Sequence, residues 1–122
     1  MRVFVYGSLR KGQIYHHVIE SAEFVGSAET PPLYELFDLG DYPAMVRGGR
    51  TRVQGEVYEV GAGLLEVLDE FEDHPELYQR QEIGLADGQR VKTYLYPRES
   101  LKSPVRVDDG DWPSYRELSS KH

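Results

Sequence analysis

Short apolar runs separated by frequent turn signals constrain the fold of this chain more than any other feature of its sequence. Pro31-Pro32, Gly48-Gly49 and Asp87-Gly88 are examples of these turn signals. Short runs of apolar and β-branched residues between such signals predict β-strands, and Asp-Gly between two of them predicts a hairpin. The strands predicted on this basis cover residues 2–6, 24–28, 33–38, 44–47, 53–60, 78–85 and 91–96.

Two segments have helical rather than strand character. The first covers residues 13–21, and the second covers residues 62–72, with the sequence "AGLLEVLDEFE". Pro75 stops the second helix, because a proline disfavours the helical conformation in the residue before it. The tail after Pro97 is polar and is predicted to be irregular. Many short strands with few helices predict an α+β fold, and we expect a single domain over residues 1–122, a small mixed β-barrel flanked by helices.

Composition narrows the class of protein and the chemistry open to it. The 122 residues are 39% hydrophobic and 29% charged, which is the ordinary balance of a globular domain that folds without disulfides or metals. The sequence has no cysteine, which excludes disulfides, thiolate nucleophiles and cysteine-ligated zinc. A chain without cysteine suits a reducing compartment, so we expect a cytoplasmic protein.

Charge and hydropathy patterning argue against two classes of partner. The formal net charge is -7 and the basic residues form no block or stripe, so we expect no nucleic-acid partner. No apolar run approaches the length needed to span a membrane, and the apolar stretch in "MRVFVYG" is too short for a signal sequence. We therefore expect no membrane partner either.

The loop after the first predicted strand has the composition of an anion-binding turn. Gly7 and Gly12 match the glycine spacing of a nucleotide P-loop, but the lysine and hydroxyl residue of that motif are missing after Gly12. The dinucleotide pattern G-x-G-x-x-G is also absent. Two interpretations of this loop remain open. One is a tight turn that needs a glycine, and the other is a cradle in which the backbone N–H groups of Gly7, Ser8 and Leu9 bind a small carboxylate beside a helix N-terminus.

The predicted helix over residues 62–72 carries one carboxylate on the side that should be buried. With Leu64 at zero on a helical wheel, Glu72 falls at about 80°, within the apolar stripe. The stripe consists of Leu64, Leu65, Val67, Leu68 and Phe71, and the solvent-facing residues are Glu66, Asp69 and Glu70. Burial raises the pKa of a carboxylate, which suits it to proton transfer. The alternative is a frayed helix end, where Glu72 turns into water or pairs with Arg80.

The remaining polar residues show no pattern for a metal, a cofactor or an acyl-enzyme. His16 and His17 are adjacent and would point to different faces of a helix. The acidic run over residues 108–111 lacks the length and the closing glutamate of a calcium loop. No histidine and acid stand in an order that would make Ser8 the nucleophile of a triad. We expect no metal and no cofactor.

A series of short stretches extends over nearly the whole chain in a fixed order. They are "VFVYGSLRKG", "LYEL", "DYPAMV", "VQGEVYEV", "LDEFEDHPELYQR", "TYLY" and "GDW". Together they resemble the γ-glutamylcyclotransferase-like superfamily, and in particular its γ-glutamylamine cyclotransferase and bacterial YtfP-like branch. The resemblance implies a mixed β-barrel flanked by helices, a cofactor-independent enzyme and a small γ-glutamyl molecule as its partner.

The resemblance also assigns roles to individual residues. Glu72 would be the catalytic acid/base. The implied substrate-binding residues are Tyr6, Gly7, Ser8, Leu9, Tyr78, Arg80 and Tyr115. The loop residues among them would bind the α-amino-acid end of a γ-glutamyl group, and Tyr78 and Arg80 would shape the pocket or steady Glu72.

The reaction implied by the resemblance is a cyclisation and not a hydrolysis. The substrate's own α-amine attacks its γ-carbonyl, 5-oxoproline forms, and the attached amine or amino acid leaves. Glu72 would carry a proton from the α-amine to the leaving nitrogen. Two other interpretations stay open: a non-catalytic protein that binds a γ-glutamyl or other small acid in the same pocket, and an enzyme that removes a γ-glutamyl protecting group by the same chemistry. The sequence indicates neither the leaving amine nor the oligomeric state.

Overall fold

The computed structural model describes residues 1–120, and its elements follow the predicted strands closely. The strands are β1 (Arg2–Val5), β2 (Glu23–Glu29), β3 (Tyr34–Asp38), β4 (Pro43–Arg47), β5 (Gln54–Glu59), β6 (Gln79–Gly84), β7 (Arg90–Leu95) and β8 (Val105–Arg106). The helices are α1 (Ala62–Phe71) and α2 (Trp112–Ser120), with the 3-10 turns η1 (His16–Val18) and η2 (Arg98–Ser100). Every predicted strand is confirmed, with ends that differ by no more than one residue.

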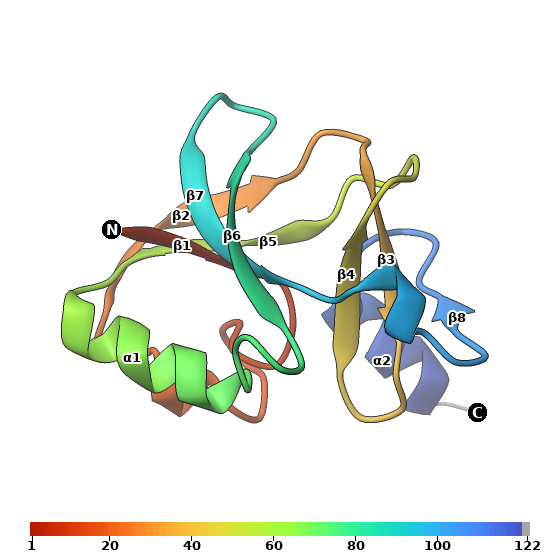
Figure 1. Ribbon diagram of the computed structural model, residues 1–122, viewed down its shortest axis with the longest axis horizontal. Helices are drawn as coiled ribbons and strands as arrows, with labels where there is room; N and C mark the ends of the chain where they lie inside the picture. The colour runs from red at the N-terminus through yellow and green to blue at the C-terminus, as the bar shows by residue number, and fades with distance from the viewer. Residues whose placement is uncertain (121–122) are drawn as a thin grey trace.

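The strands form a mixed five-stranded sheet and a smaller antiparallel sheet (Figure 1). The larger sheet has the order β2-β5-β1-β7-β6, in which β1 and β7 run parallel and the other neighbours run antiparallel. The smaller sheet has the order β4-β3-β8. The Tyr96 N–H donates to the Met45 carbonyl (2.8 Å) and joins the chain after β7 to β4. The predicted α+β class is confirmed, while over residues 1–120 the strands form two adjoining sheets and no closed barrel.

β1 lies at the centre of the larger sheet and is buried on both faces. Its side chains alternate between two hydrophobic clusters, as the two-residue period of a strand requires. Val3 and Val5 pack with Leu68 in the cluster that includes α1, whereas Phe4 packs with Met45 in the cluster shared with the smaller sheet. Burial on both faces explains the almost continuous apolar sequence of β1.

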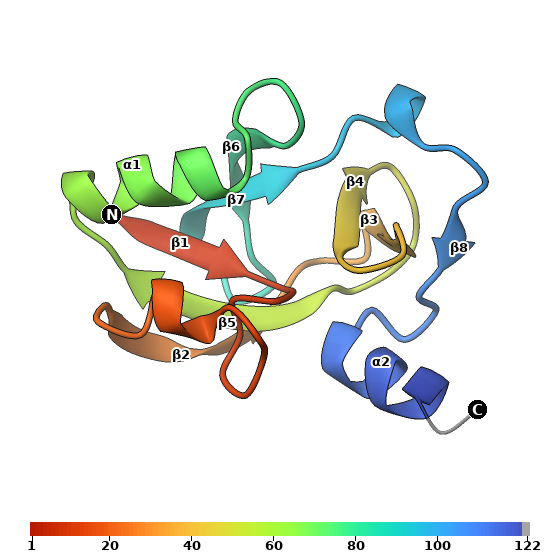
Figure 2. The same ribbon diagram turned by 90° about the horizontal axis from the view of Figure 1, so that it is seen from below.

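Helix α1 packs beside β1 and β7 (Figure 2), and its buried side matches the predicted stripe except at Val67. Leu65 and Leu68 are buried, and Phe71 lies beside them in the same cluster. Val67 is 49% exposed, so the prediction that it is buried is wrong. On the wheel it lies roughly a quarter turn from the centre of the stripe, too far to reach the sheet. The helix ends before Asp73, whose φ of 52° is left-handed and cannot continue it.

The helix predicted over residues 13–21 does not form. This segment contains only the 3-10 turn η1. It is rich in histidine and β-branched residues, which have low helix propensity, and no side chain caps the start of the turn. The loop after β1 is therefore not followed by a helix N-terminus, and the favourable helix dipole expected beside the loop is absent.

The tail after Pro97 was predicted to be irregular, but it contains β8 and α2. Pro113 lies in the first turn of α2, where a proline removes no hydrogen bond from a helix. The Ser114 hydroxyl donates to Oδ2 of Asp111 (2.6 Å), directly before the helix. Trp112 is 2% exposed and packs into the cluster shared with the smaller sheet. Burial of this tryptophan anchors a helix whose own sequence is mostly polar.

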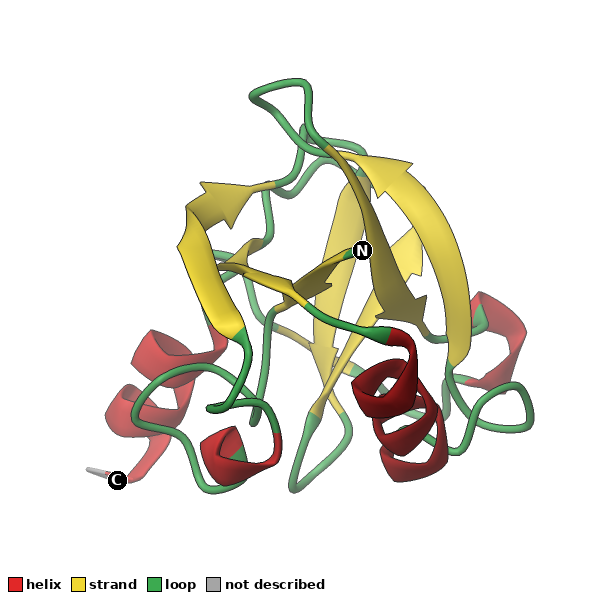
Figure 3. Ribbon diagram, turned by 90° about the vertical axis from the view of Figure 1, so that its left-hand side faces the viewer, coloured by secondary structure: helices red, strands yellow, loops and turns green. Residues whose placement is uncertain are grey.

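The helices gather at one end of the molecule, and the hairpin between β6 and β7 projects from the other (Figures 1 and 3). The loop after β1 and the turn between β3 and β4 also lie at the helical end (Figure 1). Within residues 1–120, neither helix has the length and apolar composition that a bilayer span requires.

Candidate active site

A cavity of about 260 Å³ brings together segments that are far apart in the sequence. Its walls come from the end of β1 and the following loop, the last turn of α1, the start of β4 and the chain before β6. The lining residues are Phe4, Val5, Tyr6, Gly7, Ser8, Leu9, Tyr15, Tyr42, Pro43, Phe71, Glu72, Asp73, Leu77, Tyr78 and Tyr94. The loop and the acid that the sequence analysis selected therefore line one cavity.

Residues 7–9 of the loop line this cavity and contribute no charged side chain to it. The carbonyls of Gly7 and Ser8 accept hydrogen bonds from the N–H groups of Arg10 (3.1 Å) and Tyr15 (3.0 Å). The N–H groups of Gly7, Ser8 and Leu9, in contrast, donate to no backbone acceptor within residues 1–120. Successive N–H groups of this kind can bind a carboxylate. The cradle interpretation thus needs no helix N-terminus.

Gly7 is required by close packing and not by an unusual backbone angle. A Cβ at this position would lie 2.5 Å from Cγ of Pro43, well inside van der Waals contact. The Pro43 carbonyl accepts a hydrogen bond from the Tyr78 hydroxyl (2.7 Å), which helps to hold the proline against the loop. The missing side chain at Gly7 lets the loop and β4 close one wall of the cavity.

Side chains behind the loop hold it in place. The Glu56 carboxylate on β5 is 7% exposed, and one of its oxygens accepts from the Lys11 N–H (2.9 Å) and the Tyr58 hydroxyl (3.0 Å). The Arg10 guanidinium lies 3.7 Å from Glu56 and 2.6 Å from Asp111. Burial, followed by the hydrogen bond to Glu56, raises the pKa of Tyr58, so that its hydroxyl stays a donor. These contacts tie the loop to β5 and to the chain before α2.

Glu72 directly follows the last residue of α1 and is half-buried in the cavity wall. Burial, with a second contribution from the charge of Asp73, raises its pKa from 4.5 to about 7. The alternative pairing with Arg80 does not occur, because Arg80 pairs with Asp69. A carboxylate that titrates near neutral pH can both accept and return a proton under ordinary conditions.

Two buried tyrosines form rigid walls beside Glu72. The Tyr6 hydroxyl donates to the Tyr94 carbonyl (2.6 Å) and accepts from the Met45 N–H (3.3 Å). Burial raises the pKa of Tyr6 and of Tyr78, and the charge of Glu72 raises both further. Both phenols therefore stay neutral and already have partners, so they shape the cavity and do not titrate in it.

Two residues expected to bind substrate lie outside the cavity lining. Arg80, on β6, is engaged by the Asp69 carboxylate. The Tyr115 hydroxyl donates to Oδ2 of Asp38 (2.7 Å), and its ring stacks on Trp112 at 5.6 Å. Asp69 is expected in solvent and the chain after Pro97 is expected to be irregular, so neither of these two contacts follows from the sequence.

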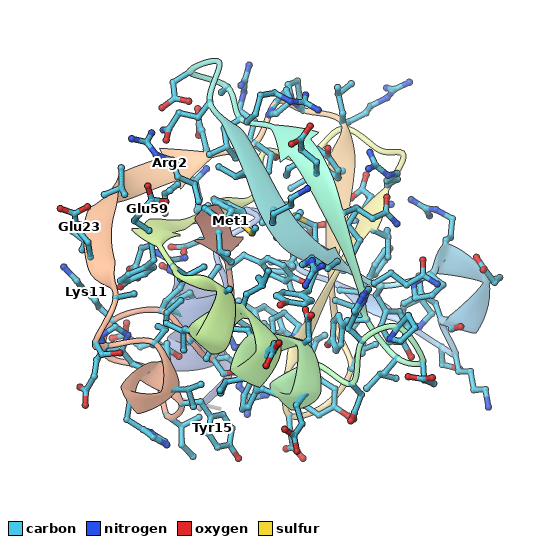
Figure 4. The ribbon with its side chains drawn as sticks, turned by 60° about the vertical axis from the view of Figure 1, so that its left-hand side comes forward. Met1, Arg2, Lys11, Tyr15, Glu23 and Glu59 are labelled. Carbon is cyan, nitrogen blue, oxygen red and sulfur yellow. The ribbon has the colours of Figure 1, made fainter. Side chains whose placement is uncertain are left out.

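Several lining residues were not selected from the sequence. Pro43 stands in the stretch "DYPAMV", but only its contact with Gly7 shows why a proline is there. Tyr15 lies below α1 at the lower edge of Figure 4, and its ring is 5.3 Å from that of Phe71. Tyr42 is 45% exposed at the β3–β4 turn. No local pattern in the sequence could have found these residues, because only the fold brings them to the same cavity.

Comparison with known proteins supports the family that this arrangement indicates. Residues 3–114 match the family model described as "Gamma-glutamyl cyclotransferase, AIG2-like". The chain is 41% identical over 110 residues to a Vibrio cholerae protein, and the alignment covers 90% of this chain and 93% of that protein. It is 39% identical over 126 residues to the Bos taurus gamma-glutamylaminecyclotransferase, covering 89% and 74%. The solution structure of ytfP from Escherichia coli superimposes with a TM-score of 0.74 at 34% identity, covering 95% and 99%.

The fold and the family match define a small α+β enzyme of the cyclotransferase class. The chain belongs to the γ-glutamylcyclotransferase family, in the branch that includes gamma-glutamylaminecyclotransferase and YtfP. Within residues 1–120, no group of three or more histidine, aspartate or glutamate side chains is placed to hold a metal ion.

Proposed function

We propose that this protein converts γ-glutamyl amines or γ-glutamyl amino acids into 5-oxoproline and the free amine. The observation that carries the proposal is the shared cavity, in which the 7–9 loop and a carboxylate with a pKa of about 7 line the same space. The name of the bovine relative supports the same class of substrate. Glu72 acts as the catalytic acid/base in this proposal, and the loop binds the substrate's α-carboxylate.

The reaction needs a bent substrate and one proton carrier. The N–H groups of Gly7, Ser8 and Leu9 hold the α-carboxylate, and the neutral tyrosine walls confine the chain so that its α-amine meets its γ-carbonyl. Fixing such a geometry lowers the barrier by several kcal/mol, about 7 or more in well-oriented systems. Glu72 first accepts a proton from the α-ammonium, which frees the lone pair of the amine, and the amine then attacks the γ-carbonyl to form the new C–N bond. Glu72 gives this proton to the departing nitrogen as the old C–N bond breaks. The new ring nitrogen loses a second proton, which passes through Glu72 to the released amine, so that 5-oxoproline and the protonated amine leave.

This scheme requires no nucleophile from the enzyme. The attacking nitrogen belongs to the substrate, so the absence of cysteine from the sequence removes nothing that the reaction needs. Ser8 contributes its backbone N–H, and its hydroxyl has no role in bond making. The cavity wall, not a covalent intermediate, determines which carbonyl is attacked.

The charges in the cavity favour a leaving group without a carboxylate. Among the lining residues only Glu72 and Asp73 carry a formal charge, and both are acidic. A γ-glutamyl amino acid brings a second carboxylate, which would find no cation there and would be repelled by both acids. We therefore expect γ-glutamyl amines to react faster than γ-glutamyl amino acids of the same size, by about tenfold.

The test is release of 5-oxoproline, measured by mass spectrometry, from γ-glutamylethylamide and from γ-glutamylalanine. The proposal expects release from both, faster from the amide, and none with the Glu72→Gln protein. Release of glutamate instead would identify a hydrolase and contradict the proposal. Calorimetric binding of both compounds without any product would favour the non-catalytic binding protein.

We also propose that residues 1–122 act as one domain in the cytoplasm. The family model matches residues 3–114 as one segment, which supports a single unit. The absence of cysteine suits a reducing compartment. Cell fractionation with detection of the native protein tests the compartment.

A further inference from the structure

Asp69 lies one helical turn before Glu72, outside the cavity lining, and joins two strands to the end of α1. Its Oδ1 accepts a hydrogen bond from the Tyr94 hydroxyl of β7 (2.7 Å), and its Oδ2 forms an ion pair with the Arg80 guanidinium of β6. Both partners of the ion pair are half-buried. A charge-assisted contact in such a place is stronger and more rigid than one on the surface.

Hydrogen bonds among the same residues also hold the segment that carries Glu72 in place. The His74 N–H donates to the Asp69 carbonyl (2.9 Å), and the Arg80 N–H donates to Nδ1 of His74 (2.9 Å). The Tyr78 N–H donates to the Glu72 carbonyl (3.3 Å). These contacts hold the two ends of segment 69–80 together, and Glu72 lies within this segment.

The Tyr94 phenol shows how close the charges of this group lie to one another. Burial raises the pKa of Tyr94, Asp69 and Glu72 raise it further, and Arg80 lowers it. Tyr94 also lines the cavity. The Tyr94 hydroxyl donates to Asp69, and Tyr94 lines the same cavity as Glu72, so the ion pair lies beside the proposed acid/base.

We propose that Asp69 and Arg80 are a positioning pair that fixes Glu72 against the cavity and keeps the charge beside its carboxylate balanced. This inference rests on the proposed function and gives Arg80 a role other than substrate binding. The two charges of the pair offset each other, so that burial and Asp73 dominate the behaviour of Glu72. Removal of either partner leaves an uncompensated charge about one helical turn, roughly 6 Å, from Glu72.

The sign of the effect distinguishes this role from a purely structural one. The other titratable groups near Glu72 belong to four segments: Asp73 and His74 after α1, Tyr6 and Tyr15 around the loop after β1, Tyr42 and Tyr78 on the opposite wall, and Tyr94 on β7. None of these changes in the variants below. Asp69→Asn leaves Arg80 unpaired, and its positive charge lowers the pKa of Glu72. Arg80→Gln leaves Asp69 unpaired, and its negative charge raises the pKa of Glu72.

The experiment is a carbon-13 NMR titration of the Glu72 carboxyl, assigned by its loss in Glu72→Gln. We expect a downward shift in its midpoint for Asp69→Asn and an upward shift for Arg80→Gln, each of about one pH unit. The double variant Asp69→Asn/Arg80→Gln returns close to the wild-type midpoint. The matched control is Arg90→Gln, which breaks the exposed Arg90–Glu82 pair (3.1 Å) on the same hairpin and should leave the midpoint unchanged.

Shifts of the same sign in the two single variants, or shifts no larger than that of Arg90→Gln, overturn the charge role. The direction of the midpoint shift is specified for each single variant separately. If one variant folds poorly, the other therefore still tests the charge role. Arg80→Lys tests geometry: it keeps the charge and loses the planar guanidinium. It should keep the midpoint and lower kcat several-fold with little change in KM, and an unchanged kcat overturns the positioning role.

The titration needs no turnover, so the two proposals can fail separately. If the wild-type protein releases no 5-oxoproline while the two single variants shift Glu72 in opposite directions, the proposed function fails and the charge balance stands. If 5-oxoproline is released while the midpoints do not move as stated, the proposed function stands and this inference fails.

Discussion

The loop side and the helix side of the cavity use different parts of the polypeptide. On the loop side, residues 7–9 line the cavity and have no charged side chain, and their backbone N–H groups donate to no backbone acceptor within residues 1–120. On the helix side, two carboxylates line the cavity, and one of them, Glu72, has a pKa of about 7 because it is half-buried. The loop side is suited to binding an anion and the helix side to moving a proton.

Each side is supported from behind by a carboxylate and an arginine that do not line the cavity. Glu56 and Arg10 support the loop, whereas Asp69 and Arg80 support the end of α1. In the proposed function, binding and proton transfer therefore depend on two different sets of supporting residues. Substitutions behind the loop should therefore change KM, and substitutions at the helix end should change kcat.

Glu72→Gln tests the helix side of the cavity and is expected to change activity more than any other substitution. The amide cannot exchange a proton, so kcat should fall by at least about 10²-fold, while affinity for a γ-glutamyl amine changes little. Release of 5-oxoproline and calorimetric titration measure the two quantities. The control is Glu70→Gln, an exposed glutamate in the same helix. A folded Gln variant with near wild-type kcat would contradict the role of Glu72.

The same substitution should change stability in a pH-dependent way. The folded pKa of Glu72, about 7, lies above its ordinary value of 4.5, so the folded state binds this proton more tightly than the unfolded state. This carboxylate has no effect on stability below the lower value and becomes destabilising as pH rises through the higher one. Urea denaturation at about pH 8 should show Glu72→Gln to be more stable than wild type by on the order of 2 kcal/mol.

At about pH 4, below the ordinary pKa of 4.5, that difference should nearly vanish, because Glu72 is then mostly protonated in both the folded and the unfolded state. An equal difference at both pH values would mean that Glu72 is not desolvated, and the contrast between the two sides of the cavity would lose its physical basis.

Gly7→Ala tests the loop side with an intermediate effect. The new Cβ would lie 2.5 Å from Cγ of Pro43, so the loop and β4 must move apart. We expect affinity for a γ-glutamyl amine, measured calorimetrically in the Glu72→Gln background, to fall by about tenfold. Gly63→Ala in α1 is the control, since its Cβ would meet no atom within 4 Å. Unchanged affinity in Gly7→Ala would count against the cradle.

Glu56→Gln should give the smallest effect, and it should separate the two sides of the cavity because it changes KM and not kcat. It weakens the acceptor for the Lys11 N–H and removes the charge that faces Arg10. We expect KM to rise about three- to fivefold with kcat within about twofold of wild type. The control is Glu59→Gln on the same strand, whose carboxylate is 45% exposed. A fall in kcat at constant KM would show that the loop also takes part in proton transfer.

The strand pattern, helix α1 and the two key segments of the cavity could be predicted from the sequence because their signals are local. Alternation and turn residues specify the strands, and Glu72 lies on the apolar side of a wheel that needs only the helical period. The same wheel misplaced Val67 and Asp69, which lie at the edges of the stripe. At an edge, the partner decides burial: Asp69 is held by Arg80 and Tyr94, whereas Val67 is 49% exposed.

By itself the sequence determined the α+β class and the ends of the seven predicted strands to within a residue, and it singled out the loop and Glu72, because short-range periodicity and backbone restrictions carry that information. The tertiary structure alone decided that the strands form two sheets, that Trp112 anchors α2, that Pro43 closes on Gly7 and that Arg80 pairs with Asp69. Each of these depends on side chains from distant segments meeting in space, which no local pattern can specify.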